Sequence, residues 1–192
     1  MECRFRIEGT SVILRTAVPA DLDDYARWSD PNLKAWQYDG PWYHSGDKGQ
    51  ATRKRTVDLE QTPPYKRLEI ETREGVHLGW LVVYQKDNDP HMTEIGIDIV
   101  EEAYWEKGLG TEALFMWVDY LFRERSLTRI GFSTWVGNQR MIAVGLKLGF
   151  AEECRIRNGC EVGGKFYDRI KMGILREEWD NVRDSQLRRF SK

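Results

Sequence analysis

The chain has 192 residues, of which 41% are hydrophobic and 31% charged, and its formal net charge is -2. These proportions are typical of a folded domain and exclude an intrinsically disordered chain. The acidic balance also argues against a nucleic-acid-binding protein, because contacts with phosphates need a basic surface.

The same residues argue against a membrane or secreted protein. No apolar run approaches the roughly 18 to 20 residues that a membrane span needs, and residues 1–6 lack the apolar core of a signal peptide. Cys3, Cys154 and Cys160 are odd in number and lack the spacing of a metal site, which fits reduced thiols. A Cys154–Cys160 pair is the alternative. We therefore expect one cytosolic domain over residues 1–192.

The first third of the chain predicts a hairpin, a helix and a long loop. Residues 4–8 and 12–15 read as strands on either side of a Gly-Thr turn. A helix is expected to begin at residues 19–21 and to run through Trp28. Residues 30–49 are rich in Pro, Gly, Asp and aromatic residues and read as a loop, and a second helix is expected within residues 50–61, before two prolines.

The middle of the chain predicts the core of a sheet. Residues 67–71 and 78–84 read as strands around a Glu-Gly turn, and residues 93–100 form the clearest strand pattern. An amphipathic helix over 109–125 and a strand over 129–135 follow. This strand, helix and strand should form a parallel crossover. The fold class is therefore α/β or α+β, with a central mixed sheet.

The last third predicts a helix, two strands and a polar helical tail. Asn158-Gly159 and Gly163-Gly164 are expected to bound a turn region between the two strands. The expected elements are a helix at 138–148, strands at 150–157 and 166–175, and a helical tail at 177–189.

A glycine loop, Tyr-Trp-Glu-Lys-Gly-Leu-Gly-Thr at residues 104–111, lies between a strand and a helix. Glycines let the backbone approach an anion, and the free amides of a helix N-terminus favour phosphate there. Glycines that pack the helix closely are the alternative. A dinucleotide site would need a third glycine where Ala113 stands, and the lysine of a P-loop is also missing.

A second motif begins at Asn138 and ends with Lys-Leu-Gly-Phe at residues 147–150. Asn138 is a good helix N-cap and Gly149 a good helix terminator, so both residues also have purely structural explanations.

In order and spacing, the two motifs together resemble the GNAT superfamily of acyl-CoA N-acyltransferases, in particular its branch of ribosomal-protein N-terminal and spermidine acetyltransferases. The resemblance implies one GNAT-like domain with a mostly antiparallel twisted sheet, and acetyl-CoA as co-substrate without a metal. It implies that pantetheine lies beside Ile99 and Val100 and contacts Asn138. The residues that it places on the pyrophosphate are Trp105, Glu106, Lys107, Gly108, Leu109, Gly110 and Thr111.

The chain departs from the family pattern at several positions. Glu106 would place a carboxylate near the pyrophosphate, so we expect it to point outward. Many members have a tyrosine acid where this chain has Gly145, and some have a serine where it has Met141. These departures keep two alternatives open: a non-catalytic acyl-CoA-binding module, and a transferase of longer acyl groups.

The acceptor is expected to be a small cationic amine or a protein N-terminus, bound by a monomer or homodimer. Trp36, Tyr38, Asp39 and Trp42 lie where family members bind substrate, and an ammonium over an aromatic ring gains about 0.5 to 2 kcal/mol. The alternative is that these rings plug the core. The three histidines share no common spacing, so no metal site is expected.

Glu94 is the candidate general base. Period-two alternation puts Glu94 and Asp98 on one face of the strand at 93–100, about 13 Å apart. Glu94 could draw the ammonium proton through water; a buried pair with an arginine is the alternative. A backbone amide of Ile99 or Val100 is the expected oxyanion donor.

Overall fold

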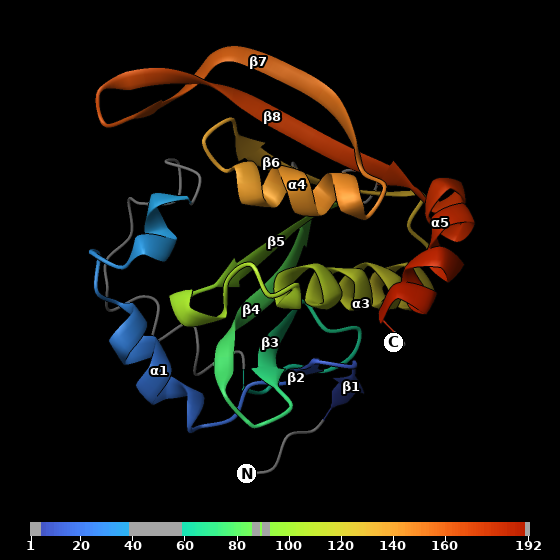
Figure 1. The fold of residues 1–192 in the computed structure, drawn as a ribbon. Helices are drawn as coiled ribbons and strands as arrows, with labels where there is room; N and C mark the ends of the chain where they lie inside the picture. Colours follow the sequence, from blue (N-terminus) through green and yellow to red (C-terminus); the bar gives the residue numbers. More distant parts are fainter. Residues whose placement is uncertain (1–4, 39–58, 86–88, 90–92, 191–192) are drawn as a thin grey trace. The chain divides into compact units, whose positions relative to one another are not determined.

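The computed structural model describes residues 5–38, 59–85, 89 and 93–190, with the side chain of Arg189 left out (Figure 1). These residues form one sheet of eight strands in the order β1-β2-β3-β4-β5-β6-β8-β7. The strands are β1 (Arg6–Glu8), β2 (Val12–Arg15), β3 (Arg67–Thr72), β4 (His77–Gln85), β5 (Thr93–Ile99), β6 (Arg129–Trp135), β7 (Ala151–Val162) and β8 (Lys165–Leu175).

The sheet is mixed, as expected. β1, β2, β3 and β4 pair antiparallel in succession, and β6, β8 and β7 do the same. β5 and β6 are parallel, with Glu94 opposite Gly131. The predicted strand–helix–strand crossover is therefore confirmed, and its parallel pair meets at the start of β5.

The helices also follow the predicted order. They are α1 (Asp21–Trp28), α3 (Leu109–Glu124), α4 (Gln139–Lys147) and α5 (Arg176–Phe190), with short 3-10 turns η1 (Lys34–Gln37) and η4 (Glu102–Tyr104). Most of the helix expected within 50–61 lies outside the described residues, and residues 59–60 form a turn. None of the described helices is both long and apolar enough to cross a membrane. A cytosolic location stays a prediction.

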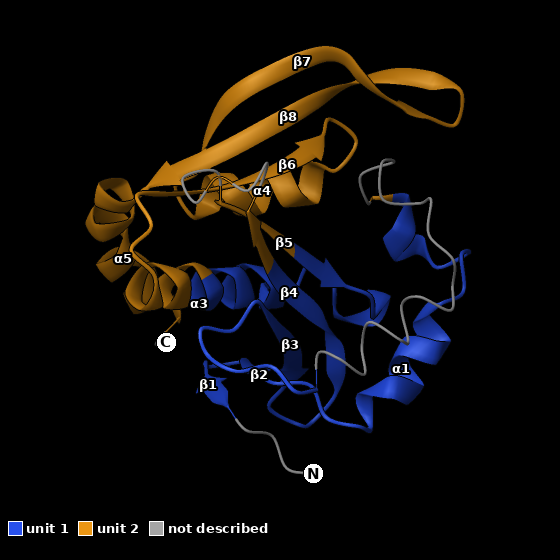
Figure 2. Ribbon diagram, turned by 180° about the vertical axis from the view of Figure 1, so that it is seen from behind, with its two compact units in different colours: residues 1–37, 46–82, 97–117 blue, residues 38–45, 83–96, 118–192 orange. Residues whose placement is uncertain are grey.

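The chain divides into two compact units, each discontinuous in sequence (Figure 2). Unit 1 contains residues 1–37, 46–82 and 97–117, and unit 2 contains residues 38–45, 83–96 and 118–192. The boundary passes through β4, β5 and α3.

Unit 1 has its core around β2 and the N-terminal half of α3. Every residue of β2 is buried, and the indole of Trp117 donates to the carbonyl of Val82 at 3.2 Å. Residues 111–122 of α3 are all buried. The prediction of an amphipathic helix with one exposed face was therefore wrong for this stretch. A helix that is buried on all sides belongs to the interior of a protein and not to its surface.

Unit 2 uses α5 as part of its core. We expected a polar tail, yet Trp179 on α5 is 1% exposed and its ring lies 6.2 Å from that of Phe122. Arg176, the first residue of α5, donates to the carbonyls of Phe122, Arg125 and Leu127. These hydrogen bonds satisfy carbonyl groups at and just after the C-terminus of α3, which lack a partner within the helix.

The β7–β8 hairpin is longer than predicted. Asn158-Gly159 was expected to bound a turn, but β7 continues through it to Val162 with a bulge between Ile156 and Cys160. Asn158 adopts a φ of 53°, which asparagine tolerates and which lets the strand absorb extra residues. The turn therefore lies at Gly163-Gly164.

The cysteines described are free, which rules out the Cys154–Cys160 pair. Burial raises the pKa of the Cys160 thiol. Cys3 lies outside the described residues.

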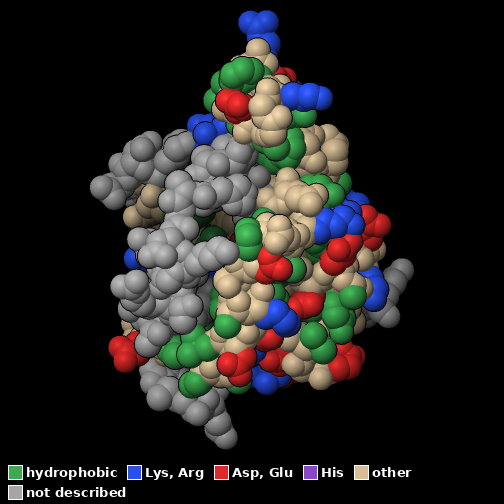
Figure 3. Space-filling view, turned by 90° about the vertical axis from the view of Figure 1, so that its left-hand side faces the viewer, with side chains coloured by type: hydrophobic (Ala, Val, Ile, Leu, Met, Phe, Trp, Pro, Cys, Tyr) green, Lys and Arg blue, Asp and Glu red, His purple; other side chains and the backbone are tan. Residues whose placement is uncertain are grey.

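Charged side chains of both signs are interspersed on the face shown in Figure 3. On the described part of this face, the mixture matches the small net charge of the chain.

Candidate functional site

The glycine loop is held at its start by Trp105. The Trp105 indole donates to the carbonyl of Ile99 at 2.8 Å, which ties the loop to the end of β5. Glu106 and Gly108 then adopt positive φ values of 63° and 84°. Glu106 is exposed, as we expected for a carboxylate in an anion-binding loop.

The loop ends at the N-terminus of α3, where the amides of Thr111 and Glu112 both donate to the carbonyl of Gly108. The amides of Leu109 and Gly110 precede these first helical bonds, so the helix offers them no internal acceptor. Together with the helix dipole, such amides attract an anion.

The two glycines leave space around these amides. A Cβ at Gly108 would meet no atom within 4 Å, and one at Gly110 would come no closer than 3.7 Å, to the Ile99 side chain. The backbone is therefore open to close approach by a phosphate group. This observation fits the pyrophosphate of a coenzyme A molecule to the residues present.

Two ammonium groups lie beside the same loop. Lys107 Nζ is 5.2 Å from the Tyr104 ring centre, and Lys34 Nζ is 5.6 Å from that of Trp105. Lys34 also forms an ion pair with Glu102, so its charge is already balanced. Lys107 adds positive charge next to the helix N-terminus.

One of the two expected oxyanion donors at the end of β5 is not available. The amide of Val100 donates to the carbonyl of Leu78 at 2.8 Å, so it is not the free oxyanion donor that we considered. Successive amides of a strand point to opposite sides, which leaves Ile99 as the remaining candidate.

Glu94, the candidate base, is 6% exposed on β5. The Ser133 hydroxyl lies 3.1 and 3.2 Å from its two oxygens, and the Tyr84 hydroxyl donates to it at 3.4 Å. Sequence reasoning missed both partners. Ser133 lies two residues beyond Gly131, the register partner of Glu94, so it shares that residue's face. The pairing of β5 with β6 was the signal that could have identified it.

Asn138 is the N-cap of α4, where its Oδ1 accepts from the Met141 amide at 3.1 Å. Its Nδ2 donates to the carbonyl of Tyr38 at 2.9 Å, and the Trp135 indole donates to the same carbonyl at 3.1 Å. The structure thus brings Asn138 together with one of the predicted acceptor residues.

The predicted acceptor residues fall in different places. Trp36 packs on the cluster of Tyr25, Trp28 and Val100, near the end of β5, and its indole donates to the carbonyl of Asp30. Tyr38 has the guanidinium of Arg140 4.7 Å from its ring centre. Asp39 and Trp42 lie outside the described residues.

Residues 11–151 match the family described as the Acetyltransferase (GNAT) domain. The chain belongs to the GNAT acetyltransferase family. A relative of this GNAT protein is YdaF of Bacillus subtilis, a candidate ribosomal N-acetyltransferase, with 32% identity over 107 residues. That alignment covers 56% of this chain and 58% of YdaF, so the chain spans little more than half of its curated relative.

Two solved structures share the fold. The spermidine N-acetyltransferase of Vibrio cholerae, in complex with CoA and spermine, has a TM-score of 0.72 at 18% identity, over 88% of this chain and 98% of that one. RimL, a ribosomal L7/L12 alpha-N-protein acetyltransferase in complex with coenzyme A, has a TM-score of 0.72 at 15% identity, over 89% and 98% of the two chains. At these identities the likeness establishes the fold.

Packing explains why this GNAT protein has no tyrosine at position 145. A Cβ at Gly145 would lie 2.6 Å from the Phe132 ring and 3.2 Å from the sulfur of Met172. The side chain of Phe132 therefore fills the space that a residue at 145 would use. Some relatives carry a serine where this chain has Met141. The backbone amide of Met141 donates to the Asn138 cap of α4, and its side chain has no proton to give to a leaving thiolate.

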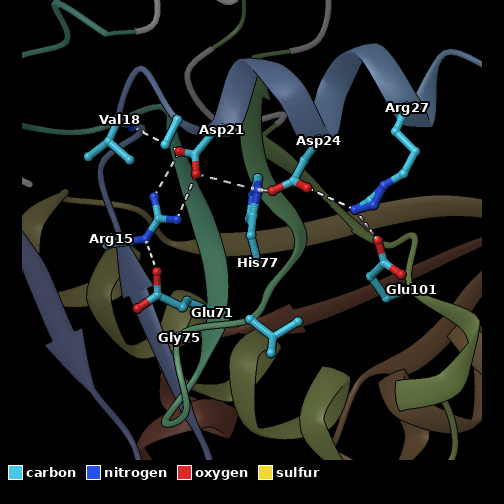
Figure 4. A pocket seen from close by; sticks show the side chains of 11 residues that line it. Arg15, Val18, Asp21, Asp24, Arg27, Glu71, Gly75, His77 and Glu101 are labelled. Carbon is cyan, nitrogen blue, oxygen red and sulfur yellow. Dashed lines mark hydrogen bonds and ion pairs between the residues drawn. The ribbon is translucent and has the colours of Figure 1, made fainter.

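A second polar cluster in unit 1 surrounds a cavity of about 450 Å³ (Figure 4). Arg15 makes a bidentate pair with Asp21 at 2.7 and 2.8 Å and contacts Glu71 at 2.6 Å. Burial lowers the pKa of Arg15, but the hydrogen bonds and charges of Asp21 and Glu71 more than offset this and raise it above its ordinary value.

His77 joins this cluster, which the spacing of the histidines did not predict. Its Nδ1 lies 3.0 Å from Asp24 and 3.5 Å from Asp21, so the three side chains could in principle share a cation. Arg15 already supplies a positive charge to both oxygens of Asp21, which makes the arrangement an ion-pair network. Arg27 extends the network from Asp24 to Glu101, next to η4.

Proposed function

We propose that the protein transfers an acetyl group from acetyl-CoA to a primary amine, by direct attack in a ternary complex. The acceptor is a small cationic amine or the α-amine of a protein N-terminus. The observation that carries the proposal is the open glycine turn at the N-terminus of α3, beside the end of β5. Relatives named for spermidine and for ribosomal-protein acetylation support the choice of an amine.

The donor side is built mainly from backbone. We assign the pyrophosphate to residues 105–111, with the amides of Leu109 and Gly110 as its main donors. Pantetheine is assigned to the strand end at Ile99 and Val100, and to Asn138. Bound acetyl-CoA supplies the acyl group as a thioester.

Glu94 is proposed to accept the proton of the attacking amine. The amine nitrogen forms a bond to the acyl carbon, the carbon–sulfur bond breaks, and the amine proton passes to the Glu94 carboxylate through water. Ser133 and Tyr84 hold this buried carboxylate in one orientation. The leaving thiolate resembles that of cysteine, with a pKa of about 8.5, so water can protonate it without a tyrosine at 145.

Glu94→Gln tests this role, because it keeps the shape of the side chain and removes its basicity. We expect kcat at neutral pH to fall by roughly 100-fold or more. The loss should shrink as rising pH deprotonates the amine in solution. Ser133→Ala, which removes a partner of Glu94 and leaves the carboxylate, is the matched control and should lose less. Normal turnover with an unchanged pH profile in Glu94→Gln would contradict the assignment.

Two arguments favour an α-amine over a polyamine. The guanidinium of Arg140 lies 4.7 Å from the ring centre of Tyr38. A ring face already covered by a cation is less available to the additional ammonium groups that a polyamine carries and an α-amine lacks. An α-amine, with a pKa of about 7.7 to 8.0, also needs less help to lose its proton than a lysine-like amine near 10.4.

Thiol release from acetyl-CoA, measured with a peptide that has a free N-terminus and with spermidine, tests the function and its acceptor. We expect saturable turnover with a higher kcat/KM for the peptide. Binding of acetyl-CoA without amine-dependent thiol release would favour the non-catalytic module. Faster thiol release with a longer acyl-CoA would favour a transferase of longer acyl groups.

Asp39 and Trp42 stay predicted acceptor residues. Asp39→Asn should raise the KM of the acceptor more than that of acetyl-CoA, because it removes a negative charge from the ammonium and leaves the glycine loop unchanged. Equal increases in both KM values would indicate a packing role.

A further inference from the structure

The carbonyl of Tyr38 is held by two side chains from one strand–helix junction. The Trp135 indole at the end of β6 donates to it at 3.1 Å, and the Asn138 amide at the N-cap of α4 donates at 2.9 Å. A carbonyl oxygen has two lone pairs. Both are therefore used, and the backbone of Tyr38 is fixed relative to this junction.

Both donors are themselves fixed in place. The other end of the Asn138 amide accepts from the Met141 amide, so the cap holds the orientation of the group. Trp135 is 7% exposed, and its ring packs edge-on against Tyr167 with 5.1 Å between centres. A Cβ at Gly137 would overlap that ring, so the glycine lets the indole pack against the turn before α4.

A third side chain of the same junction holds the ring of Tyr38. The Arg140 guanidinium, in the first turn of α4, lies 4.7 Å from the ring centre. The attraction of a cation over the face of an aromatic ring restricts the rotation of that side chain. Backbone and ring of Tyr38 are thus both held by Trp135, Asn138 and Arg140, which we call the Tyr38 clamp.

We propose that the Tyr38 clamp positions the acceptor-binding side of the enzyme. In this view Asn138 acts through Tyr38 on the amine, in addition to any contact with pantetheine. The amide can serve both purposes, because Nδ2 carries two N–H groups and one of them is directed at Tyr38. The inference rests on the proposed function, since Tyr38 is an acceptor residue only if the protein is an amine acetyltransferase.

The sharpest test is Asn138→Asp. Aspartate caps a helix as well as asparagine does, so α4 should keep its stability. The substitution removes the N–H donor and places a carboxylate oxygen against the Tyr38 carbonyl. We expect the acceptor KM to rise by roughly tenfold, the effect of one lost hydrogen bond. The Kd of coenzyme A, measured by calorimetry, should rise by a smaller factor than the acceptor KM, because the N–H that the substitution removes from Tyr38 belongs to the acceptor side.

Trp135→Phe is the second variant, since it keeps an aromatic ring and removes the indole donor to the same carbonyl. It should also raise the acceptor KM selectively. Gln139→Ala is the matched control, because this neighbouring side chain donates to the carbonyl of Val136 and not to that of Tyr38. Its acceptor KM should equal that of the wild type. The acceptors are spermidine and a peptide with a free N-terminus.

The outcomes separate the inference from the function on which it rests. Equal increases of the acceptor and acetyl-CoA KM values in Asn138→Asp would assign the residue to the donor side alone and overturn the inference. Wild-type KM values in both Asn138→Asp and Trp135→Phe would overturn it as well. A wild-type protein that binds coenzyme A but acetylates no amine would instead contradict the proposed function, and the inference with it.

Discussion

The glycines of the glycine loop and those around α4 serve opposite purposes. In the glycine loop, a Cβ at Gly108 would meet no atom within 4 Å and one at Gly110 would make ordinary contacts from 3.7 Å. Around α4, the space that a side chain at Gly137 or Gly145 would need is already filled by neighbouring rings. The Trp135 ring covers Gly137, and Phe132 would lie 2.6 Å from a Cβ at Gly145.

This difference separates two functions of glycine that look the same in a sequence. A glycine with open space beside free amides can admit a ligand to the backbone. A glycine whose space is filled by a neighbouring ring serves packing, and the interior density leaves no room for a larger residue. Substitutions in the first group should therefore change binding, and those in the second should change stability.

The largest effect is expected from Gly145→Tyr, which restores the tyrosine common in the family. The phenol has no space beside Phe132 and Met172, so the free energy of unfolding should fall by about 3 kcal/mol or more. Denaturant unfolding measures this. A stable variant with increased kcat would show that the position is an open acid site and would break the distinction between the two groups.

Gly110→Val should have the next largest effect, on binding alone. Its branched side chain fills the space next to the Leu109 and Gly110 amides, and the loss of one or two hydrogen bonds to a charged group corresponds to roughly 10- to 100-fold in coenzyme A affinity. Calorimetric titration measures the Kd, and thermal unfolding confirms the fold. Gly110→Ala is the control and should bind nearly as well as the wild type. A folded valine variant with wild-type affinity would contradict the assignment of this loop to the pyrophosphate of coenzyme A.

Gly137→Ala should destabilise the protein by about 1 to 3 kcal/mol, because the Trp135 ring must move from its buried position. Denaturant unfolding again gives the value. Since Trp135 belongs to the Tyr38 clamp, the acceptor KM should rise in parallel. Unchanged stability would show that the ring relaxes without cost.

Gly108→Ala should have the smallest effect on stability, about 1 kcal/mol, because its φ of 84° strains any residue with a Cβ although no neighbour is in the way. The same substitution should weaken coenzyme A binding less than Gly110→Val does. Thermal unfolding and titration of one sample measure both quantities. A stability loss as large as that of Gly145→Tyr would contradict the idea that this position is open.

Local patterns predicted most of the elements. The strand-forming runs of β2, β3 and β4, the proline before α1 with the aspartates in its first turn, and the Asn138 cap are each carried by a few adjacent residues. The errors arose where tertiary contacts override local signals. Asn158-Gly159 is a turn signal, but pairing with β8 carries β7 through it. The polar composition of α5 hid Trp179, which packs beside Phe122.

The candidate site shows the same difference between features carried by adjacent residues and features that depend on tertiary contacts. The glycine loop was recognised because the residues that form it are contiguous in the chain. Ser133 and Tyr84 around Glu94, and the Tyr38 clamp, were missed because their members are far apart in the sequence. His77 beside Asp21 and Asp24 was missed for the same reason.

The sequence by itself determined the order of strands and helices, the family resemblance and the position of the glycine loop before α3, because each depends on spacing within a short segment. The tertiary structure decided which glycines are open and which are filled, which amides at the end of β5 are already bonded, and which side chains hold Glu94 and Tyr38. Those properties depend on atoms that only strand pairing and helix packing bring within hydrogen-bond distance.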